Sequence, residues 1–260
     1  MRFYDAHAHL QDARLSAVIS SLGDSDEPLT VVTNGTCPAD WPAVAALEGR
    51  GSLRVLKAYG VHPWKVEELP EDWENDLRER LHGGAVSVGE IGLDHWIEPR
   101  RPSLQREVFE RQLFLAREFG FVPTVHGVRA WEEVAFALRQ VSLPGGFLMH
   151  AFSGSREVQR RLLDIGGHFS FSAYAAEPSR KRMREAIAYC PLDRLLTETD
   201  APDMVPPAAS VTYPLVDTSG QAAHHPLEIR TALATVAALR GEDPDALAGC
   251  VEVTFRRLFQ

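Results

Sequence analysis

Short apolar runs rich in β-branched residues alternate along the chain with segments of helical periodicity. Eight runs predict strands, namely Arg2–His7, Leu29–Asn34, Val55–Val61, Ala85–Ile91, Val122–Gly127, Gly146–Ala151, His168–Ser172 and Arg194–Glu198. Seven segments predict helices, namely Asp12–Leu22, Pro38–Glu48, Glu71–Leu81, Ser103–Phe119, Ala130–Val141, Ser155–Ile165 and Ser179–Tyr189. Because the strand runs are apolar on both faces, they are typical of a parallel sheet covered on each side.

This alternation predicts an α/β fold, a single-domain (β/α)8 TIM barrel over residues 1–260. A doubly wound open sheet is the alternative, because periodicity alone does not show whether a sheet closes. One irregular stretch, Ala201–Ala223, is rich in Pro, Ser and Gly and follows the last predicted strand. In a barrel, this stretch would form a loop over the C-terminal face.

The charge balance limits the classes of partner. With 27 basic and 36 acidic residues, the net charge is −9, so the chain as a whole does not attract nucleic acid or an anionic membrane. A phosphate-bearing substrate would therefore need local positive charge, from a metal ion or a few arginines.

The cysteines and the N-terminus predict a cytoplasmic protein. The three cysteines, Cys37, Cys190 and Cys250, are far apart and have no metal-type spacing, which is typical of reduced thiols. Asp5, His7 and His9 interrupt the first apolar run, so we do not expect a signal peptide. We expect no membrane association, because apolar runs stay well below the ~20 residues of a membrane span.

Titratable side chains stand where the predicted strands end. His7 and His9 are two residues apart on the first strand, so both side chains point to one face. In a barrel, side chains at the C-terminal strand ends share one mouth. Six residues meet this description, namely His7, His9, Glu90, His126, His150 and Asp200. Four imidazoles and two carboxylates suit two divalent ions such as Zn, Mn or Mg.

Seven motifs in order resemble those of the TatD-type metal-dependent hydrolases. They are DAHAHL, GVHPW, VGEIGLD, QREVFERQLFLA, PTVHGVRA, MHAFSGS and LLTETDAP, and the resemblance runs from Asp5 to about Pro202. A later segment, HHPLEI, is similar to the family's last motif and predicts a further helix start. The resemblance implies a TIM barrel of the amidohydrolase type that holds one or two metal ions and acts mostly on phosphodiesters of DNA.

The resemblance also implies roles for single residues. His7 and His9 would hold one ion, His126 and His150 the other, and Glu90 would bridge them. Asp200 would bind the first ion and take and return a proton, so that Asp200 and Glu90 are the catalytic residues. Ions bridged in this way would lower the pKa of a shared water from its usual value to about 7, which gives a nucleophile at neutral pH.

The substrate contacts depart from the family pattern. His126 is followed by Gly127, Val128 and Arg129, where the family usually has Ser-Arg-Asp, and His95-Trp96 follows GLD where the family favours tyrosine. We predict substrate contacts at His62, His95, Trp96 and Arg129. For His62, a structural role is the equal alternative. We expect Asp94 to orient a ligand or cap a turn, and Glu198 to anchor the barrel interior or support the site.

The predicted function is a divalent-metal-dependent hydrolase of the TatD type that cleaves phosphodiesters and acts as a deoxyribonuclease. The alternative is an amidohydrolase or phosphoesterase that acts on a small molecule, since a first-strand His-x-His also begins those groups. Many binuclear amidohydrolases bridge their ions with a carboxylated lysine after strand four. Glu90 stands there instead, which favours the first prediction.

Overall fold

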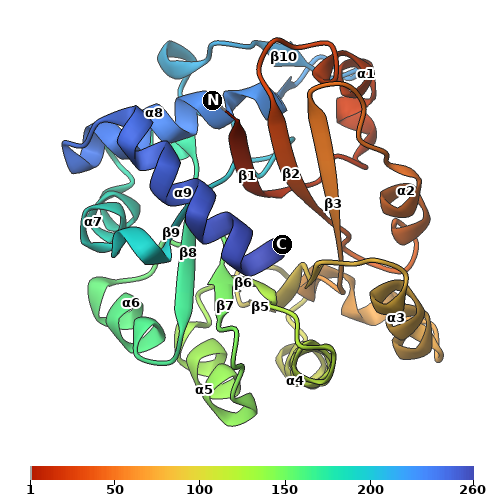
Figure 1. The fold of residues 1–260 in the computed structure, drawn as a ribbon. Coiled ribbons are helices and arrows are strands. Elements are labelled where there is room, and N and C mark those ends of the chain that lie inside the picture. The colour runs from red at the N-terminus through yellow and green to blue at the C-terminus, as the bar shows by residue number, and fades with distance from the viewer. Residues whose placement is uncertain (1) are drawn as a thin grey trace.

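Parallel strands form the centre of the molecule, and helices surround them (Figure 1). The computed structural model describes residues 2–260. The strands of the barrel are β1 (Phe3–Ala8), β2 (Leu29–Asn34), β3 (Leu53–Tyr59), β4 (Ser87–Val88), β5 (Ile91–Asp94), β6 (Thr124–Val128), β7 (Phe147–Met149), β8 (Gly167–Phe171) and β9 (Leu195–Thr197). They pair in the orders β1-β2-β3-β4 and β5-β6-β7-β8-β9, and all these pairs are parallel.

The strand order closes on itself, which confirms the barrel over the open sheet. The backbone N–H of Asp200, just after β9, donates to the carbonyl of His7 in β1 at 2.9 Å. Thr197 Oγ1 donates to the carbonyl of Tyr4 at 3.3 Å. Both contacts join the last strand to the first, so β9 lies beside β1.

The fourth strand differs from the prediction of one continuous run over Ala85–Ile91. It is divided into β4 and β5, and Gly89 and Glu90 lie between them. The N–H of Glu90 donates to the carbonyl of Gly35 at 3.0 Å, outside the regular ladder. Glu90 therefore lies at a local break in the strand, outside the regular pairing of β4 and β5 with their neighbours.

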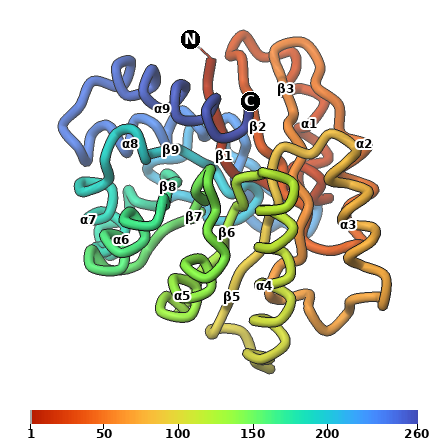
Figure 2. The backbone as a smooth tube through the Cα atoms, turned by 60° about the horizontal axis from the view of Figure 1, so that its bottom comes forward, coloured from red at the N-terminus to blue at the C-terminus, as the bar shows by residue number. Residues whose placement is uncertain are grey.

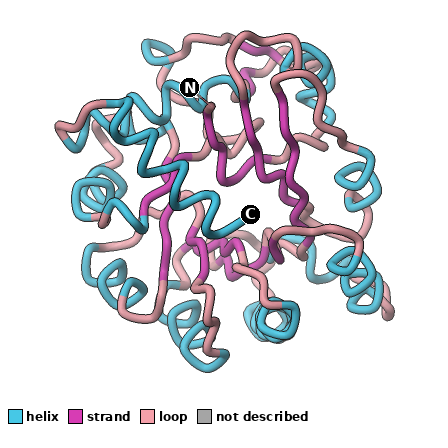
Figure 3. The backbone as a smooth tube through the Cα atoms, viewed as in Figure 1, coloured by secondary structure: helices cyan, strands magenta, loops and turns pink. Residues whose placement is uncertain are grey.

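The helices form a ring outside the strands (Figure 3). They are α1 (Ser16–Leu22), α2 (Trp41–Ala46), α3 (Trp73–His82), α4 (Pro102–Phe119), α5 (Trp131–Val141), α6 (Arg156–Leu163), α7 (Lys181–Tyr189), α8 (Ile229–Arg240) and α9 (Pro244–Phe259). The first seven match the predicted segments with shifted ends. The segment HHPLEI leads through a short 3-10 turn into α8, as expected, whereas α9 was not predicted.

Helix α9 covers the N-terminal ends of the strands, where both chain ends lie (Figure 2). Phe255 is fully buried, and its ring centroid is 4.9 Å from that of Tyr4 near the start of β1. Arg257 donates to the carbonyl of Asp193, just before β9. Because this end is closed, the open end of the barrel is the C-terminal one.

The predicted loop Ala201–Ala223 follows β9 and contains a 3-10 turn and both strands of a small hairpin. The hairpin pairs β10 (Leu215–Val216) with β11 (Ala222–Ala223). Asp203 and Met204 of this loop line a cavity at the open end of the barrel, as the prediction of a loop over that face requires. Among residues 2–260, none of the helices combines the length and the apolar character that crossing a bilayer requires.

Candidate metal centre

A cavity of about 1120 Å³ opens at the C-terminal ends of the strands. Its floor contains five of the six predicted ligands, namely His9, Glu90, His126, His150 and Asp200. The sixth, His7, lies directly behind them and is fully buried. The structure therefore brings together all six side chains that the sequence placed at strand ends.

Glu90 lies at the centre of the cluster, and its two oxygens face different imidazoles. Oε2 is 3.3 Å from Nε2 of both His7 and His9. Oε1 is 2.9 Å from His126 Nδ1 and 2.7 Å from His150 Nε2. One carboxylate thus divides the four imidazoles into two pairs.

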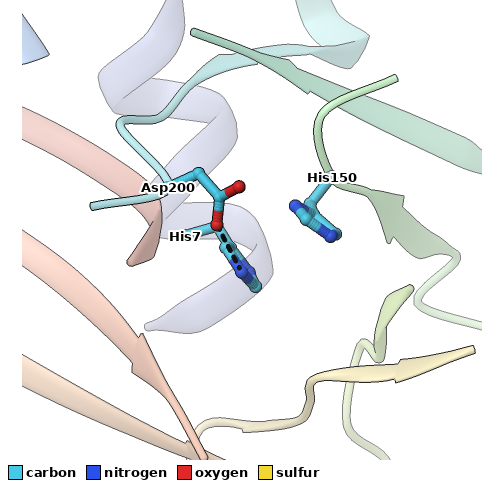
Figure 4. A group of neighbouring side chains, drawn as sticks. All are labelled: His7, His150 and Asp200. Atoms are coloured by element: carbon cyan, nitrogen blue, oxygen red, sulfur yellow. Dashed lines mark ion pairs between the residues drawn. The ribbon is translucent and has the colours of Figure 1, made fainter. Parts of the chain in front are cut away.

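Asp200 completes the side of the cluster that contains His7 and His9. Its Oδ1 is 3.4 Å from His7 Nε2 and 3.6 Å from His9 Nε2. Figure 4 shows the Asp200 carboxylate directed at the His7 ring, with His150 entering from another strand. Ligand atoms of His7, His150 and Asp200 lie within 4.8 Å of one another, and so do those of His7, His9 and Glu90.

The backbone at two of these positions is unusual. Asp200 has φ 59°, and Ala151, directly after His150, has φ 45°. Non-glycine residues adopt this left-handed region at a cost, and they do so most often at functional sites. The hydrogen bond from Asp200 N–H to the His7 carbonyl holds this conformation and so aims the carboxylate inward.

A backbone carbonyl fixes the proton of His9. Nδ1 of His9 is 2.8 Å from the carbonyl oxygen of Asn34 at the end of β2. A carbonyl only accepts hydrogen bonds, so Nδ1 carries the proton and donates. In the neutral ring, Nε2 then presents its lone pair to the side where Glu90 and Asp200 converge, as a metal ligand requires.

A carboxylate fixes the proton of His126 in the same way. Nε2 of His126 is 3.1 Å from Asp94 Oδ2, so Nε2 donates, and in the neutral ring Nδ1 would present its lone pair on the side of Glu90. Asp94 Oδ2 also accepts from Trp64 Nε1 at 2.7 Å, and its Oδ1 accepts from the N–H of Trp96 at 2.6 Å. Asp94 therefore both orients His126 and caps a turn, the two roles that were considered for it.

His62 has the opposite arrangement. Its Nδ1 accepts from the backbone N–H of Trp64 at 3.1 Å, so the proton of the neutral ring is on Nε2. That Nε2 is 3.3 Å from Glu90 Oε1 and donates toward it. Although His62, Glu90 and His126 are close enough to form a metal site, this tautomer makes His62 a hydrogen-bond donor.

The ionisation of the cluster is consistent with a cation site. Burial alone would raise the pKa of Glu90, but the imidazoles, His150 first, hold it well below its usual value. Burial lowers the pKa of His126, yet its contacts with Asp94 and Glu90 raise it to about 9. Protons thus occupy positions that a metal ion would take, and metal binding would release them. The donor set and the tautomers of His9 and His126 fit a divalent metal.

Two buried acids support the cluster from below. Glu198 accepts from the N–H of Ala151 at 2.6 Å and from the Ser170 hydroxyl, and burial raises its pKa to about 8. Asp5 accepts from the N–H of Thr199 at 3.0 Å and that of His7 at 3.2 Å. Both acids hold the backbone beside a predicted ligand, and this favours the second of the two roles predicted for Glu198, an acid that supports the site.

The four predicted substrate contacts have different positions. His62 and its neighbour Trp64 line the cavity. His95, Trp96 and Arg129 lie on the loops after β5 and β6 and do not contribute to the cavity lining. The Arg129 guanidinium stacks on the Trp96 ring, 3.8 Å from its centroid, and His95 Nε2 is 3.7 Å from Glu133.

The cavity also has lining residues that the sequence reasoning missed. Lys65 follows His62, and Arg180, Lys181 and Arg182 stand at the start of α7. The run Ser179–Arg182 follows the seventh barrel strand, and its three consecutive basic residues are the signal that could have revealed the cations at α7.

Comparisons with known proteins agree on one family. The family model described as TatD related DNase matches residues 4–260. An uncharacterized metal-dependent hydrolase of Escherichia coli, YcfH, is 32% identical over 206 residues, which cover 79% of this chain and 74% of that protein. A protein of Citrobacter koseri named 3'-5' ssDNA/RNA exonuclease TatD is 29% identical over 77% of this chain and 76% of its own length. The crystal structure of the TatD homologue YjjV from Escherichia coli superposes with a TM-score of 0.87 at 26% identity, covering 99% and 97% of the two chains.

Proposed function

Because this chain belongs to the TatD related DNase family of metal-dependent hydrolases, we propose that it cleaves phosphodiester bonds of single-stranded nucleic acid. One relative is named as an exonuclease of single-stranded DNA and RNA, which supports this substrate class. The family membership makes the chain a hydrolase that acts on ester bonds. The proposal adds the substrate and the roles of single residues.

The division of Glu90 between two imidazole pairs is the observation that carries the proposal. Oε2 faces His7 and His9, and Oε1 faces His126 and His150, which supports a role in which Glu90 would hold one ion on each side. Asp200 adds an oxygen to the first pair. Mixed nitrogen and oxygen ligands suit Zn²⁺, Mn²⁺ or Mg²⁺. Divalent ions held there would supply positive charge to the phosphoryl group and lower the pKa of water to about 7.

Asp200 is the residue that would move the proton. Burial alone would raise its pKa, but the hydrogen bond from His9 and the nearby imidazoles lower it, so the carboxylate is ionised at neutral pH. It lines the cavity, where its oxygen can accept the proton of the attacking water. The same group can return that proton to the departing alkoxide, so one acid serves both halves of the reaction.

His62 would hold the central carboxylate of the cluster in place. Its Nε2–H points toward Glu90 Oε1 at 3.3 Å, and burial lowers the pKa of the ring, which keeps it neutral. A neutral imidazole has one N–H, and here it is directed at Glu90 while Nδ1 accepts from the N–H of Trp64. This favours the structural alternative for His62, and its contact with substrate stays a prediction.

The test is an activity assay on substrates of different chemical class. The purified chain is incubated with Mn²⁺, Mg²⁺ or Zn²⁺ and labelled single-stranded DNA, RNA, duplex DNA, bis(p-nitrophenyl) phosphate, an ester and an amide. We expect cleavage of the single strands and of the phosphodiester, loss of both with a chelator, and loss of both in Asp200→Asn. Cleavage confined to the ester or the amide would contradict the proposal and favour a small-molecule amidohydrolase.

A further inference from the structure

We propose that two walls of the cavity bind the nucleotides on either side of the scissile phosphate, so that the substrate is an oligonucleotide chain. The α7 wall consists of Tyr174, Ser179, Arg180, Lys181 and Arg182, and the β3 wall consists of Trp64 and Lys65. The proposal rests on the phosphodiesterase function above and adds where the rest of the strand lies.

The barrel topology places the two walls across the mouth from each other. The β3 wall follows β3, the third strand position, and the α7 wall follows β8, the seventh of eight. Positions four apart in an eight-stranded barrel lie on opposite sides. The Glu90 cluster is built from strand ends around the same mouth, so it lies between the walls.

The α7 wall combines positive charge with an aromatic ring. Arg180, Lys181 and Arg182 are exposed, and all three line the cavity. The Arg180 guanidinium carbon is 4.2 Å from the centroid of the Tyr174 ring, and its N–H donates to the Tyr174 hydroxyl. Stacked aromatic and guanidinium planes next to free cations are the features by which proteins hold bases and phosphates of single strands.

The β3 wall offers the same two features on a smaller scale. Trp64 Nε1 donates to Asp94 Oδ2 at 2.7 Å, which fixes the indole ring, and yet the residue is 55% exposed. An exposed ring with fixed orientation loses little entropy when a base stacks on it. Lys65, beside it, is half-buried and adds one positive charge.

The acids that line the cavity do not form ion pairs with the cations of the two walls, because their side chains have other partners. Arg14 pairs with Asp12 and Asp203 at 2.8 Å each. Asp40 accepts from the N–H of Thr36 at 2.9 Å. Over residues 2–260, Lys65, Lys181 and Arg182 have no carboxylate within 4.0 Å, so their charges remain available to phosphates despite the net charge of −9.

The experiment compares Arg180→Gln/Lys181→Gln/Arg182→Gln with a matched control in which three exposed arginines away from the cavity, Arg54, Arg117 and Arg160, are changed to Gln. Binding of a labelled single-stranded oligonucleotide is followed by fluorescence anisotropy in EDTA over a range of salt concentrations. Each single-strand phosphate contact contributes about 0.7 to the slope of log K against log salt. We expect the α7 triple variant to bind at least tenfold more weakly and to lose about 2 from that slope, and the control to change neither.

Kinetics separates this proposal from the proposed function. With metal, the ratio of kcat/KM on the oligonucleotide to that on bis(p-nitrophenyl) phosphate should fall at least tenfold in the α7 variant, and Lys65→Gln should lower it less. Equal losses on both substrates, or unchanged binding and salt slope, would overturn the two-wall proposal while leaving phosphodiester cleavage intact. Binding that depends on the wall without cleavage of any phosphodiester would instead overturn the proposed function alone.

Discussion

The contact between Asp94 and His126 gives the sharpest prediction about the metal centre. In Asp94→Asn, Oδ1 can still accept from the N–H of Trp96, but an NH₂ group would replace Oδ2. Two donors, His126 Nε2–H and Trp64 Nε1–H, would then face a third donor. The ring can relieve this conflict by moving its proton to Nδ1, which removes the lone pair that faces Glu90.

The magnitude follows from the kind of interaction that is lost. A hydrogen bond to a charged group contributes about 1.5–3 kcal/mol. Removal of an acid that orients a ligand imidazole costs about 10–100-fold in metal affinity or activity. We therefore expect the Kd for one of two bound Mn²⁺ ions to rise about 10–100-fold, with partial recovery of turnover at high metal concentration.

Calorimetric titration of the metal-free protein with Mn²⁺, together with a metal titration of bis(p-nitrophenyl) phosphate cleavage, measures this change. The control is Glu228→Gln, because Glu228 is equally buried and accepts backbone N–H groups of Thr212 and Tyr213, away from the cavity. Thermal unfolding confirms that both variants fold. If Asp94→Asn binds both ions with wild-type affinity, the tautomer of His126 does not depend on Asp94 and the reasoning is wrong.

Three further predictions test other parts of the molecule. His126→Ala should abolish metal-dependent turnover with an unchanged circular dichroism spectrum; full activity at normal metal content would refute its role as a ligand. His168 accepts from Arg257 at 3.1 Å, and burial lowers its pKa to about 4. Below pH ~6.5 the folded chain then binds fewer protons at His168 than the unfolded chain does. The free energy of unfolding, measured with urea, should therefore fall by about 3 kcal/mol as the pH is lowered from ~6.5 to ~4. In His168→Gln, the free energy of unfolding should change less over the same pH range. Phe255→Ala should lower the free energy of unfolding by about 3–5 kcal/mol in the same assay. The control is Val253→Ala on the same helix: Val253 is 66% exposed, so its loss should be under about 0.5 kcal/mol. Similar losses in both variants would show that α9 does not seal the barrel through Phe255.

Much of the fold was predictable because its signals are local. The apolar runs and helical segments identified all eight strand positions and the first seven helices, since periodicity depends only on neighbouring residues. The break at Gly89 and Glu90 was missed because it involves a hydrogen bond to Gly35, which follows β2 and is distant in the sequence. Helix α9 was missed as well, although it shows an apolar face over Leu247, Val251 and Phe255.

The candidate site divides in the same way. The convergence of His7 and His9 follows from strand geometry, and the order of motifs was sufficient to place Glu90, His126, His150 and Asp200 around one mouth. The predicted contacts at His95, Trp96 and Arg129 do not line the cavity, and the cations that do line it at α7 were overlooked. A side chain's position relative to a cavity depends on loop conformation, which strand periodicity does not determine.

By itself, the sequence determined which side chains are available for metal chemistry and on which strand ends they stand. Only the tertiary structure decided which nitrogen of each ring is free to bind. The Asn34 carbonyl fixes His9, Asp94 fixes His126, and the N–H of Trp64 makes His62 a donor. The physical reason is that a proton's place on an imidazole depends on the partner that the fold brings to each nitrogen, and for His9 and His126 that partner comes from a distant part of the chain.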